Sequence, residues 1–427
     1  MLQSPMNKSR YRARFRYSMR FQLGGGLLVA VLLPWLIRVA VDPALVDVVT
    51  VRNSALASLF AAIFGFYIYR SLTIYPGIRA GYYILPSFSV AYGIIPLYFL
   101  MGRMDYSRFL LASGYIVSLI WYFGLFFMAQ RDRSLRVAIV PFGAVQLKDV
   151  EQVEWVKLKT PNDPSPLSYD ALVADFRADL PDKWERFLAD SALAGTTVYH
   201  VKDLRESLTG RVQIDHLSEN SFGSLIPARA YFKIKEAIDF VAALVGGVIL
   251  LPFLLVAAAF IRFDSPGPIL FRQLRVGYGG TPFRVYKFRT MIHRVDVEAD
   301  DLRGAITNEA DPRITKAGRL LRRYRIDELP QLLNVLRGEM SLIGPRPEAE
   351  VLSKWYEKEL PFYRYRHIVK PGITGWAQVN QGHVAEVTDV LWKLQYDFFY
   401  IKNFSPWLDG LILFRTVKTM LTGFGSR

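Results

Sequence analysis

Two adjacent carboxylates, Asp327 and Glu328, stand directly before Leu329-Pro330 in the C-terminal half of the chain. This order is typical of a helix start with proline in the first turn. Carboxylates at such a position meet the positive end of the helix dipole and stay ionised. Four basic residues lie upstream: Arg319, Arg322, Arg323 and Arg325. An ionised carboxylate in a basic field can act as a nucleophile or a metal ligand in phosphate chemistry, although such a pair taken alone is more often a helix cap.

Further basic and polar side chains occur in segments that favour a rigid backbone. Lys287 and Arg289 alternate with apolar residues, as on the wet face of a strand. Arg346 lies in a Gly/Pro loop, and Thr374 and Gln378 lie in a second one that starts at residue 370. Such loops can be plain turns, and the basic strand can attract anionic lipid. Their combination beside the arginine-rich stretch predicts a phosphate-binding site instead, to which Arg322 also contributes.

The amino-acid composition excludes several other classes of protein. The chain has 427 residues, 52% apolar and 21% charged, with a net charge of +15 and no cysteine. Thiolate metal sites, disulfide scaffolds and cysteine nucleophiles are therefore excluded. The positive charge suits an anionic membrane face, a polyanionic substrate or nucleic acid, but no nucleic-acid motif occurs and the basic residues lie near membrane boundaries. We therefore expect no nucleic-acid partner.

The elements that carry the site follow four uncharged apolar runs, at residues 21–37, 54–69, 83–101 and 109–130. Each approaches the length of a membrane helix. The N-terminal arm, residues 1–20, is strongly basic, and the residues that follow Gln130 are basic again. The positive-inside rule therefore predicts four spans with both flanks in the cytoplasm. These runs hold no ionisable residue, so an anchor or assembly bundle is favoured over a transporter.

A fifth apolar run, residues 240–261, has basic residues on both flanks and Pro252 near its middle. Proline removes a backbone hydrogen bond and kinks a helix. Since no charge asymmetry drives the chain across, we expect a bent helix that enters the cytoplasmic leaflet and returns. A proline-kinked fifth span is the alternative.

Between the spans and this run, residues 131–228 are soluble in composition. Strands are expected at 136–143, 153–159 and 196–201, with a helix at 181–193. This alternation predicts a small α/β module, with a linker at 218–230. No glycine fingerprint for a nucleotide occurs, so a structural or regulatory role is the default.

Several motifs together resemble the monotopic phosphoglycosyl transferases, the bacterial sugar transferase family. The matching stretches are Tyr286–Met291, Asp327–Leu332, Asn334–Ser341, Gly344–Pro347 and Pro371–Gln378. The resemblance covers about residues 229–427, and the preceding segments look like the large subgroup of exopolysaccharide and O-antigen enzymes. The family's re-entrant helix breaks at Ser-Pro, which is Leu251-Pro252 here.

The resemblance implies a division of the chain into a basic cytoplasmic arm (1–20), a four-span transmembrane helical bundle (21–130), a cytoplasmic α/β module (131–228) and a mixed α/β monotopic catalytic domain (229–427). The catalytic domain would contain a re-entrant membrane helix at about 237–262, broken at Pro252.

The reaction implied by the resemblance is transfer of sugar 1-phosphate from a UDP-sugar to undecaprenyl phosphate, with release of UMP. The family's catalytic pair corresponds to Asp327, which would attack the β-phosphorus and form a phosphosugar-aspartate, and Glu328, which would help to hold Mg²⁺ together with Asp327. Lys287, Arg289 and Arg346 would contact phosphates. Oxygen ligands suit Mg²⁺, and the lack of cysteine argues against zinc.

The resemblance also implies the partners and the place of action. The donor is expected to carry glucose or galactose, the enzyme to reside in the bacterial inner membrane with its catalytic domain on the cytoplasmic face, and a homo-oligomer is allowed. The alternative from another class is a non-catalytic membrane scaffold of a polysaccharide assembly system.

Overall fold

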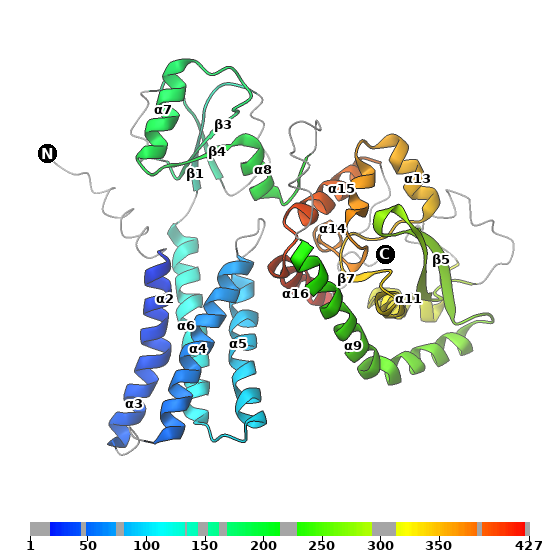
Figure 1. Cartoon of the computed structure of the whole chain (residues 1–427), viewed down its shortest axis with the longest axis horizontal. Helices are drawn as coiled ribbons and strands as arrows, with labels where there is room; N and C mark the ends of the chain where they lie inside the picture. The colour runs from blue at the N-terminus through cyan, green and yellow to red at the C-terminus, as the bar shows by residue number, and fades with distance from the viewer. Residues whose placement is uncertain are drawn as a thin grey trace. The chain divides into compact units, whose positions relative to one another are not determined.

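The computed structural model describes residues 18–43, 48–73, 81–132, 135–143, 153–161, 169–213, 229–292, 313–381 and 387–422. The chain divides into two units, Met1–Thr209 and Gly210–Arg427, which are considered separately (Figure 1). Most of the basic arm and of the expected linker at 218–230 lies outside the described residues. Residues 210–212 belong to the second unit because Trp376 Nε1 donates to Gly210 O and Val212 N donates to Gln395 O.

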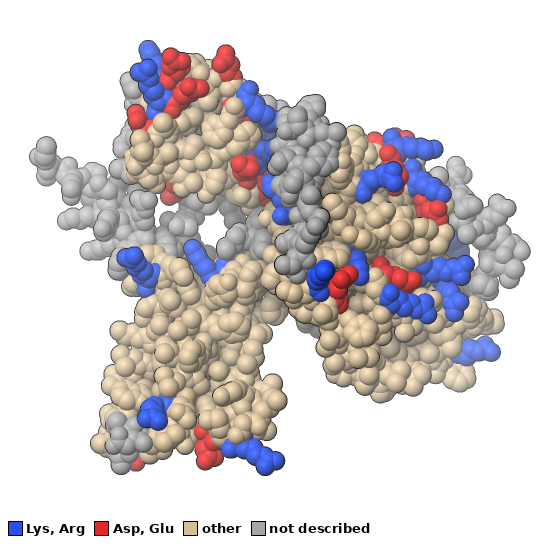
Figure 2. Space-filling view, in the orientation of Figure 1, with Lys and Arg blue, Asp and Glu red and all other residues tan. Residues whose placement is uncertain are grey.

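The first unit opens with apolar helices close to the predicted spans. They are α2 (Met19–Leu27), η1 (Leu28–Leu32), α3 (Leu33–Val41), α4 (Val49–Leu72), α5 (Gly81–Met101) and α6 (Arg108–Asp132). The first three are continuous and form one helix, Met19–Val41, which is long and apolar enough to cross a membrane, as are α4, α5 and α6. Figure 2 shows charged side chains at the two ends of this group of helices and an uncharged surface between them. This distribution suits a bilayer environment.

Aromatic side chains fill the space between these helices. Phe66, Phe88 and Tyr122 belong to one buried cluster, in which the rings of Phe88 and Tyr122 stack with their centroids 4.7 Å apart. Gly65 allows the close approach, because a Cβ there would lie 2.6 Å from the Phe88 ring. Small residues at helix contacts are typical of membrane bundles.

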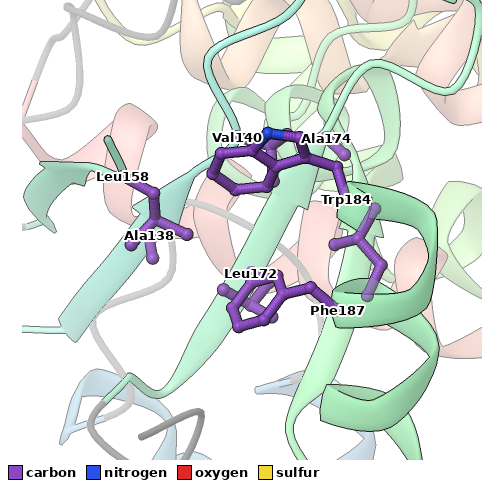
Figure 3. Close-up of a cluster of buried hydrophobic side chains, with 8 residues drawn as sticks. Ala138, Val140, Leu158, Leu172, Ala174, Trp184 and Phe187 are labelled. Carbon is purple, nitrogen blue, oxygen red and sulfur yellow. The ribbon is translucent and has the colours of Figure 1, made fainter. Parts of the chain in front are cut away.

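The α/β module consists of a parallel four-stranded sheet in the order β2-β1-β3-β4. Its strands are β1 (Leu135–Ile139), β2 (Val153–Lys157), β3 (Ala171–Ala174) and β4 (Thr197–His200), and its helices are α7 (Asp182–Leu193) and α8 (Val201–Thr209). Figure 3 shows Trp184 and Phe187 of α7 facing Leu172 and Ala138 of the sheet. The predicted α/β class is confirmed, and β3 is an additional strand that the sequence pattern did not indicate.

The second unit holds the elements that carry the candidate site. They are α9 (Arg229–Asp264), β5 (Leu270–Val276), η5 (Tyr278–Gly280), β6 (Pro282–Phe288), α11 (Lys316–Arg323), η6 (Ile326–Gln331), α12 (Leu332–Leu336), β7 (Ser341–Ile343), α13 (Glu350–Glu359), η7 (Tyr363–Ile368), β8 (Gly372–Thr374), α14 (Trp376–Asn380), α15 (Val387–Lys402) and α16 (Pro406–Thr422). Strands β5 and β6 pair antiparallel, and β7 and β8 pair parallel. The unit is therefore a mixed α/β domain, as predicted.

Helix α9 contains the fifth apolar run and Pro252, and Figure 1 shows that it changes direction along its length. Ala243, before the proline, clusters with Val285 of β6, whereas Ile261, after it, clusters with Phe288 of the same strand. In a straight helix these two α9 residues would be about 27 Å apart. The two β6 residues are only about 10 Å apart along the strand. A bend is therefore needed for both arms of α9 to enter clusters that include the same strand.

Candidate active site

The carboxylate pair lies in the first turn of η6, a 3₁₀ helix and not the α-helix that the Pro position suggested. Arg325, directly before it, has a left-handed backbone with φ of 55°. Glu328 is buried, and its Oε1 accepts hydrogen bonds from Lys287 Nζ at 2.9 Å and Arg346 Nη2 at 2.6 Å. Arg325 Nη1 lies 3.7 Å from Glu328 Oε2. Glu328 thus gathers three cations from three segments of the chain, which a simple helix-capping role would not require.

Asn334 of α12 fixes the position of Lys287 relative to this pair. The Asn334 side chain is fully buried; its Oδ1 accepts from Tyr286 N at 3.1 Å, and its Nδ2 donates to Arg284 O at 2.8 Å. Both partners are main-chain groups of β6. The strand is therefore tied to the helix that follows η6, and Lys287 is held facing Glu328.

Two close backbone contacts position the loop that carries Arg346. Gly344 N donates to Thr374 O, and Gly372 N donates to Pro345 O, each at 2.9 Å. A Cβ on Gly372 would lie 2.1 Å from Gly344 N, so a side chain there would push the two loops apart. The two Gly/Pro loops predicted from sequence as anion-site candidates thus pack directly against each other.

Burial and neighbouring charges shift the pKa values of Asp327 and Glu328 in opposite directions. Burial raises the pKa of Asp327 to about 6, and the charge of Glu328 adds to this, while Lys287 and two arginines oppose it. Burial would also raise the pKa of Glu328, but the Arg346 and Lys287 charges hold it well below its usual range. Burial lowers the pKa of Lys287 to about 8. Perturbed ionisation of this kind is typical of reactive sites.

Asp327 differs from its neighbour in its contacts. It is only partly buried, and among the described residues its carboxylate has no hydrogen bond or ion pair. Glu328 is thus held by its cations, whereas Asp327 keeps its oxygens available. This division is what a nucleophile beside a charge-organising carboxylate requires.

The other predicted site residues lie in different surroundings. Arg289 donates to Pro266 O at 2.9 Å and to Ser265 O at 2.6 Å, just after the end of α9. Its guanidinium therefore binds the main chain of the α9–β5 turn, whereas Lys287 and Arg346 donate to Glu328, and phosphate binding by Arg289 stays a prediction. Arg322 Nε donates to Thr290 Oγ1 at 2.9 Å, and its charge still acts on Asp327.

Thr374 and Gln378 line a pocket that also reaches Glu328. The remaining lining residues are Arg325, Leu329, Ile373, Val379, Thr416, Thr419 and Met420. The last three come from α16, which carries none of the site residues predicted from sequence. Their helical spacing is the signal that could have found them, since positions 416, 419 and 420 share one face.

A buried ionic network behind the Arg346 loop was also missed. Arg366 pairs with Asp397, and Lys393 pairs with Glu348. Arg366 Nη2 also donates to Arg346 O at 2.8 Å, so the network is connected to the loop. Its members are spread over some fifty positions without a motif, and only the fold brings them together.

The donor atoms at the site bear on the metal expected from sequence. Among the residues described, no group of three or more His, Asp or Glu side chains is arranged to hold a metal ion. The candidate metal ligands are therefore the two adjacent carboxylates, and the Asp327 oxygens have no hydrogen bond from another described residue. Mg²⁺ is commonly bound by one or two carboxylates together with water and substrate phosphates. The residues present therefore fit Mg²⁺ in the company of a diphosphate.

The second unit of the chain matches a known protein family. The family model for "Bacterial sugar transferase" matches residues 230–423. A UDP-N-acetylgalactosamine-undecaprenyl-phosphate N-acetylgalactosaminephosphotransferase of Aeromonas hydrophila is 46% identical over 383 residues, which cover 88% of this chain and 89% of the relative.

Two other relatives match a little less than half of the chain. A UDP-glucose:undecaprenyl-phosphate glucose-1-phosphate transferase of Caulobacter vibrioides is 44% identical over 202 residues, 47% of this chain and 74% of its own. An exopolysaccharide production protein of Rhizobium leguminosarum is 43% identical over 195 residues, 44% of this chain and 96% of its own. The Aeromonas relative is 46% identical and matches 88% of this chain. The chain therefore belongs to the bacterial sugar transferase family.

Proposed function

We propose that this protein transfers sugar 1-phosphate from a UDP-sugar to undecaprenyl phosphate and releases UMP. The observation that carries the proposal is the placement of Asp327, partly exposed, beside a Glu328 that assembles Lys287 and Arg346. The family membership and the names of the relatives, both glucose and N-acetylgalactosamine phosphotransferases, support the same reaction. The products are UMP and undecaprenyl diphosphate-linked sugar.

The reaction would proceed in two displacements. An Asp327 oxygen attacks the β-phosphorus of the donor, the bond from that phosphorus to the bridging oxygen breaks, and UMP leaves with the bond's electrons. A phosphate oxygen of undecaprenyl phosphate then attacks the same phosphorus and displaces Asp327. Splitting one transfer into two steps through a carboxylate is a recognised form of nucleophilic catalysis.

The cations around Glu328 would stabilise the charge on the reacting phosphoryl group. Lys287 and Arg346 donate to one oxygen of Glu328, so their charges lie close together, and both charges also act on Asp327. Fixed positive groups at developing phosphate charge are the main source of catalysis in phosphoryl transfer. Bound Mg²⁺, held by Asp327 or Glu328 and the donor phosphates, would neutralise the diphosphate.

The shape of α9 supports access from one face of the membrane. Apolar side chains near the bend are strongly exposed, including Val248 (66%) and Ile249 (70%). Ala243 of the first arm clusters with Val335 of α12, and Ile261 of the second arm clusters with Leu321 of α11, so both ends of the helix reach the same domain. We propose that the bend dips into the cytoplasmic leaflet of the inner membrane, where the lipid phosphate and the water-soluble donor can meet.

The relative that matches along nearly the whole chain makes N-acetylgalactosamine the first donor sugar to test. Glucose, which is in the name of a relative matching 47% of the chain, and galactose come next. Purified protein in detergent or nanodiscs would be mixed with undecaprenyl phosphate, Mg²⁺ and each UDP-sugar, and UMP would be quantified.

UMP release that depends on the lipid phosphate supports the proposal. A folded protein that releases none from any UDP-sugar would favour the non-catalytic scaffold. A phosphosugar adduct mapped to Asp327 by mass spectrometry, after incubation with donor alone, would support the covalent route directly.

A further inference from the structure

Residues Gly210–Val212 are packed into the second unit, although they precede the residues that the family model matches, 230–423. Val212 N donates to Gln395 O of α15 at 3.0 Å, and only 1% of the Val212 surface is exposed. Linkers between domains usually run exposed, with few contacts to either side. These three residues, which we call the upstream segment, therefore belong to the fold that carries the candidate site.

The first contact of the upstream segment is with Trp376, the first residue of α14. Trp376 Nε1 donates to Gly210 O at 2.9 Å. The indole is 1% exposed and stacks on the ring of Phe399 with the centroids 5.6 Å apart, and the Arg415 guanidinium lies over it, 4.7 Å from its centroid. An indole has one hydrogen-bonding group, its N–H. The Gly210 carbonyl therefore helps to fix the orientation of the buried ring.

Trp376 directly follows a residue that packs against the Arg346 loop. A Cβ on Gly375 would lie 2.2 Å from Gly344 O, so the two backbones touch at this point. Gly344 N donates in turn to Thr374 O at 2.9 Å. Because a close-packed interior transmits displacement, a shift of the Trp376 ring would move the backbone against which the Arg346 loop rests.

The second contact of the upstream segment is with α15. The Arg211 guanidinium lies over the rings of Trp392 and Tyr396, 5.2 and 5.9 Å from their centroids. Such cation–π contacts are favourable. Asp397, next to Tyr396 on the helix, belongs to the buried ion pair that is connected to the Arg346 loop. The upstream segment therefore contacts both structures that hold this loop.

We propose that Gly210–Val212 is a positioning segment of the active site. By holding Trp376 and α15, it keeps Arg346 within hydrogen-bond distance of Glu328. The proposal rests on the proposed function, because that function gives Arg346 its role at the reacting phosphoryl group. It extends the catalytic unit upstream of the residues that the family model matches.

The first test is Trp376→Phe in the full chain, which keeps an aromatic ring and removes the N–H that donates to Gly210 O. We expect kcat/KM for UMP release to fall about 10-fold, since small displacements of positioned groups are costly in catalysis. Trp184→Phe is the matched control, because Trp184 is a buried tryptophan of the first unit. Its kcat/KM should stay that of wild type.

A double-mutant cycle separates positioning from a general loss of folded protein. In an Arg346→Ala background, Trp376→Phe should lower kcat/KM by less than about 2-fold, because the group that it positions is already gone. Arg211→Met, at a half-buried position, removes the contacts with α15 and should show the same dependence. An equal proportional loss in both backgrounds, for both variants, would overturn the proposal.

Hydrogen–deuterium exchange of the full-length protein in nanodiscs, without substrate, gives a readout that needs no activity. Peptides that contain the Gly344 amide should exchange faster in Trp376→Phe and Arg211→Met than in wild type or Trp184→Phe. Unchanged exchange in both variants would overturn the proposal. Faster exchange together with no UMP release by the wild-type protein would overturn the proposed function while leaving the positioning of the loop standing.

Discussion

The guanidinium of Arg366 donates two hydrogen bonds to a single oxygen of Asp397, at 3.1 and 2.9 Å, with only 3% and 2% of the two side chains exposed. The same guanidinium donates to the carbonyl of Arg346. A fully buried ion pair thus supports the loop that presents a cation to Glu328. Stability and catalysis are coupled at this point, because loss of the pair would release the loop.

Asp397→Leu should therefore lower the free energy of unfolding by about 3–5 kcal/mol, since it leaves the Arg366 charge buried without its partner. Thermal or chemical unfolding in detergent measures the effect. Arg364→Ala is the control, because Arg364 is 78% exposed and lies 3.9 Å from Glu357, where an ion pair contributes at most about 1 kcal/mol. Equal losses for the two variants would show that the buried pair has no special role.

Asp327→Asn and Glu328→Gln should each abolish turnover for different reasons. The first removes the proposed nucleophile, and the second removes the charge that gathers Lys287 and Arg346. Asp327→Asn should unfold like wild type, because among the described residues its carboxylate has no hydrogen bond, whereas Glu328→Gln should also lose stability. Near-normal UMP release by folded Asp327→Asn would remove the covalent mechanism.

Lys287→Ala and Arg346→Ala should depress kcat/KM more than they depress the melting temperature. Arg289→Ala should show the opposite order, because its guanidinium binds Ser265 and Pro266 at the end of α9. UMP release and thermal unfolding would be measured on all three variants. A reversed order would mean that Lys287 and Arg346 are structural residues and that Arg289 contacts substrate.

The pH dependence of kcat/KM should be bell-shaped. The pKa of Asp327 is raised to about 6, so the ionised nucleophile is lost as the pH falls through that value. The pKa of Lys287 is lowered to about 8, so its positive charge is lost as the pH rises through that value. Lys287→Arg should remove the upper limb because arginine stays charged. A profile that is flat between pH 5 and 9 would contradict both assignments.

Pro252→Ala, combined with leucine substitutions nearby, should let part of the population adopt a straight, spanning α9. Because the chain has no cysteine, single cysteines placed after residue 140 and near residue 420 can be labelled with an impermeant thiol reagent. In intact cells that express the single-cysteine proteins with Pro252 in place, neither cysteine should react with reagent in the periplasm. Labelling of the C-terminal site alone would rule out the proposed dip into one leaflet.

Much of this architecture could be predicted from hydrophobic patterning. Long uncharged runs gave the apolar helices to within a few residues, and α7 begins one residue after its predicted start. The strand Ala171–Ala174 was missed because four buried residues are too few to show a period. The carboxylate pair was identified correctly as lying at a helix start, but the element is a short 3₁₀ helix, Ile326–Gln331, with Pro330 inside it, and α12 begins only afterwards. Helix propensity does not decide this local outcome.

The site itself was predictable only where a motif is contiguous. Lys287 and Arg346 were found beside Glu328 because each lies in a compact motif. The position of Arg289 depends on where α9 ends and β5 begins, which is a tertiary relationship. The Arg366–Asp397 pair likewise depends on long-range packing, so no spacing rule in the sequence indicates it. The pocket wall from α16 has a helical spacing, but that spacing does not say which part of the fold the face contacts.

The bent form of α9 has a mechanical consequence for the lipid around it. A helix that crosses a bilayer adds lateral area to both monolayers, whereas one that enters and leaves at the same face adds area to that monolayer alone. In the proposed dip into one leaflet, the exposed apolar side chains on both arms would act as a one-sided wedge. Such an insertion is favoured where the membrane bulges toward the catalytic domain, because the lipids of that monolayer are spread apart there. The bend in α9 should therefore concentrate the protein on curved membrane.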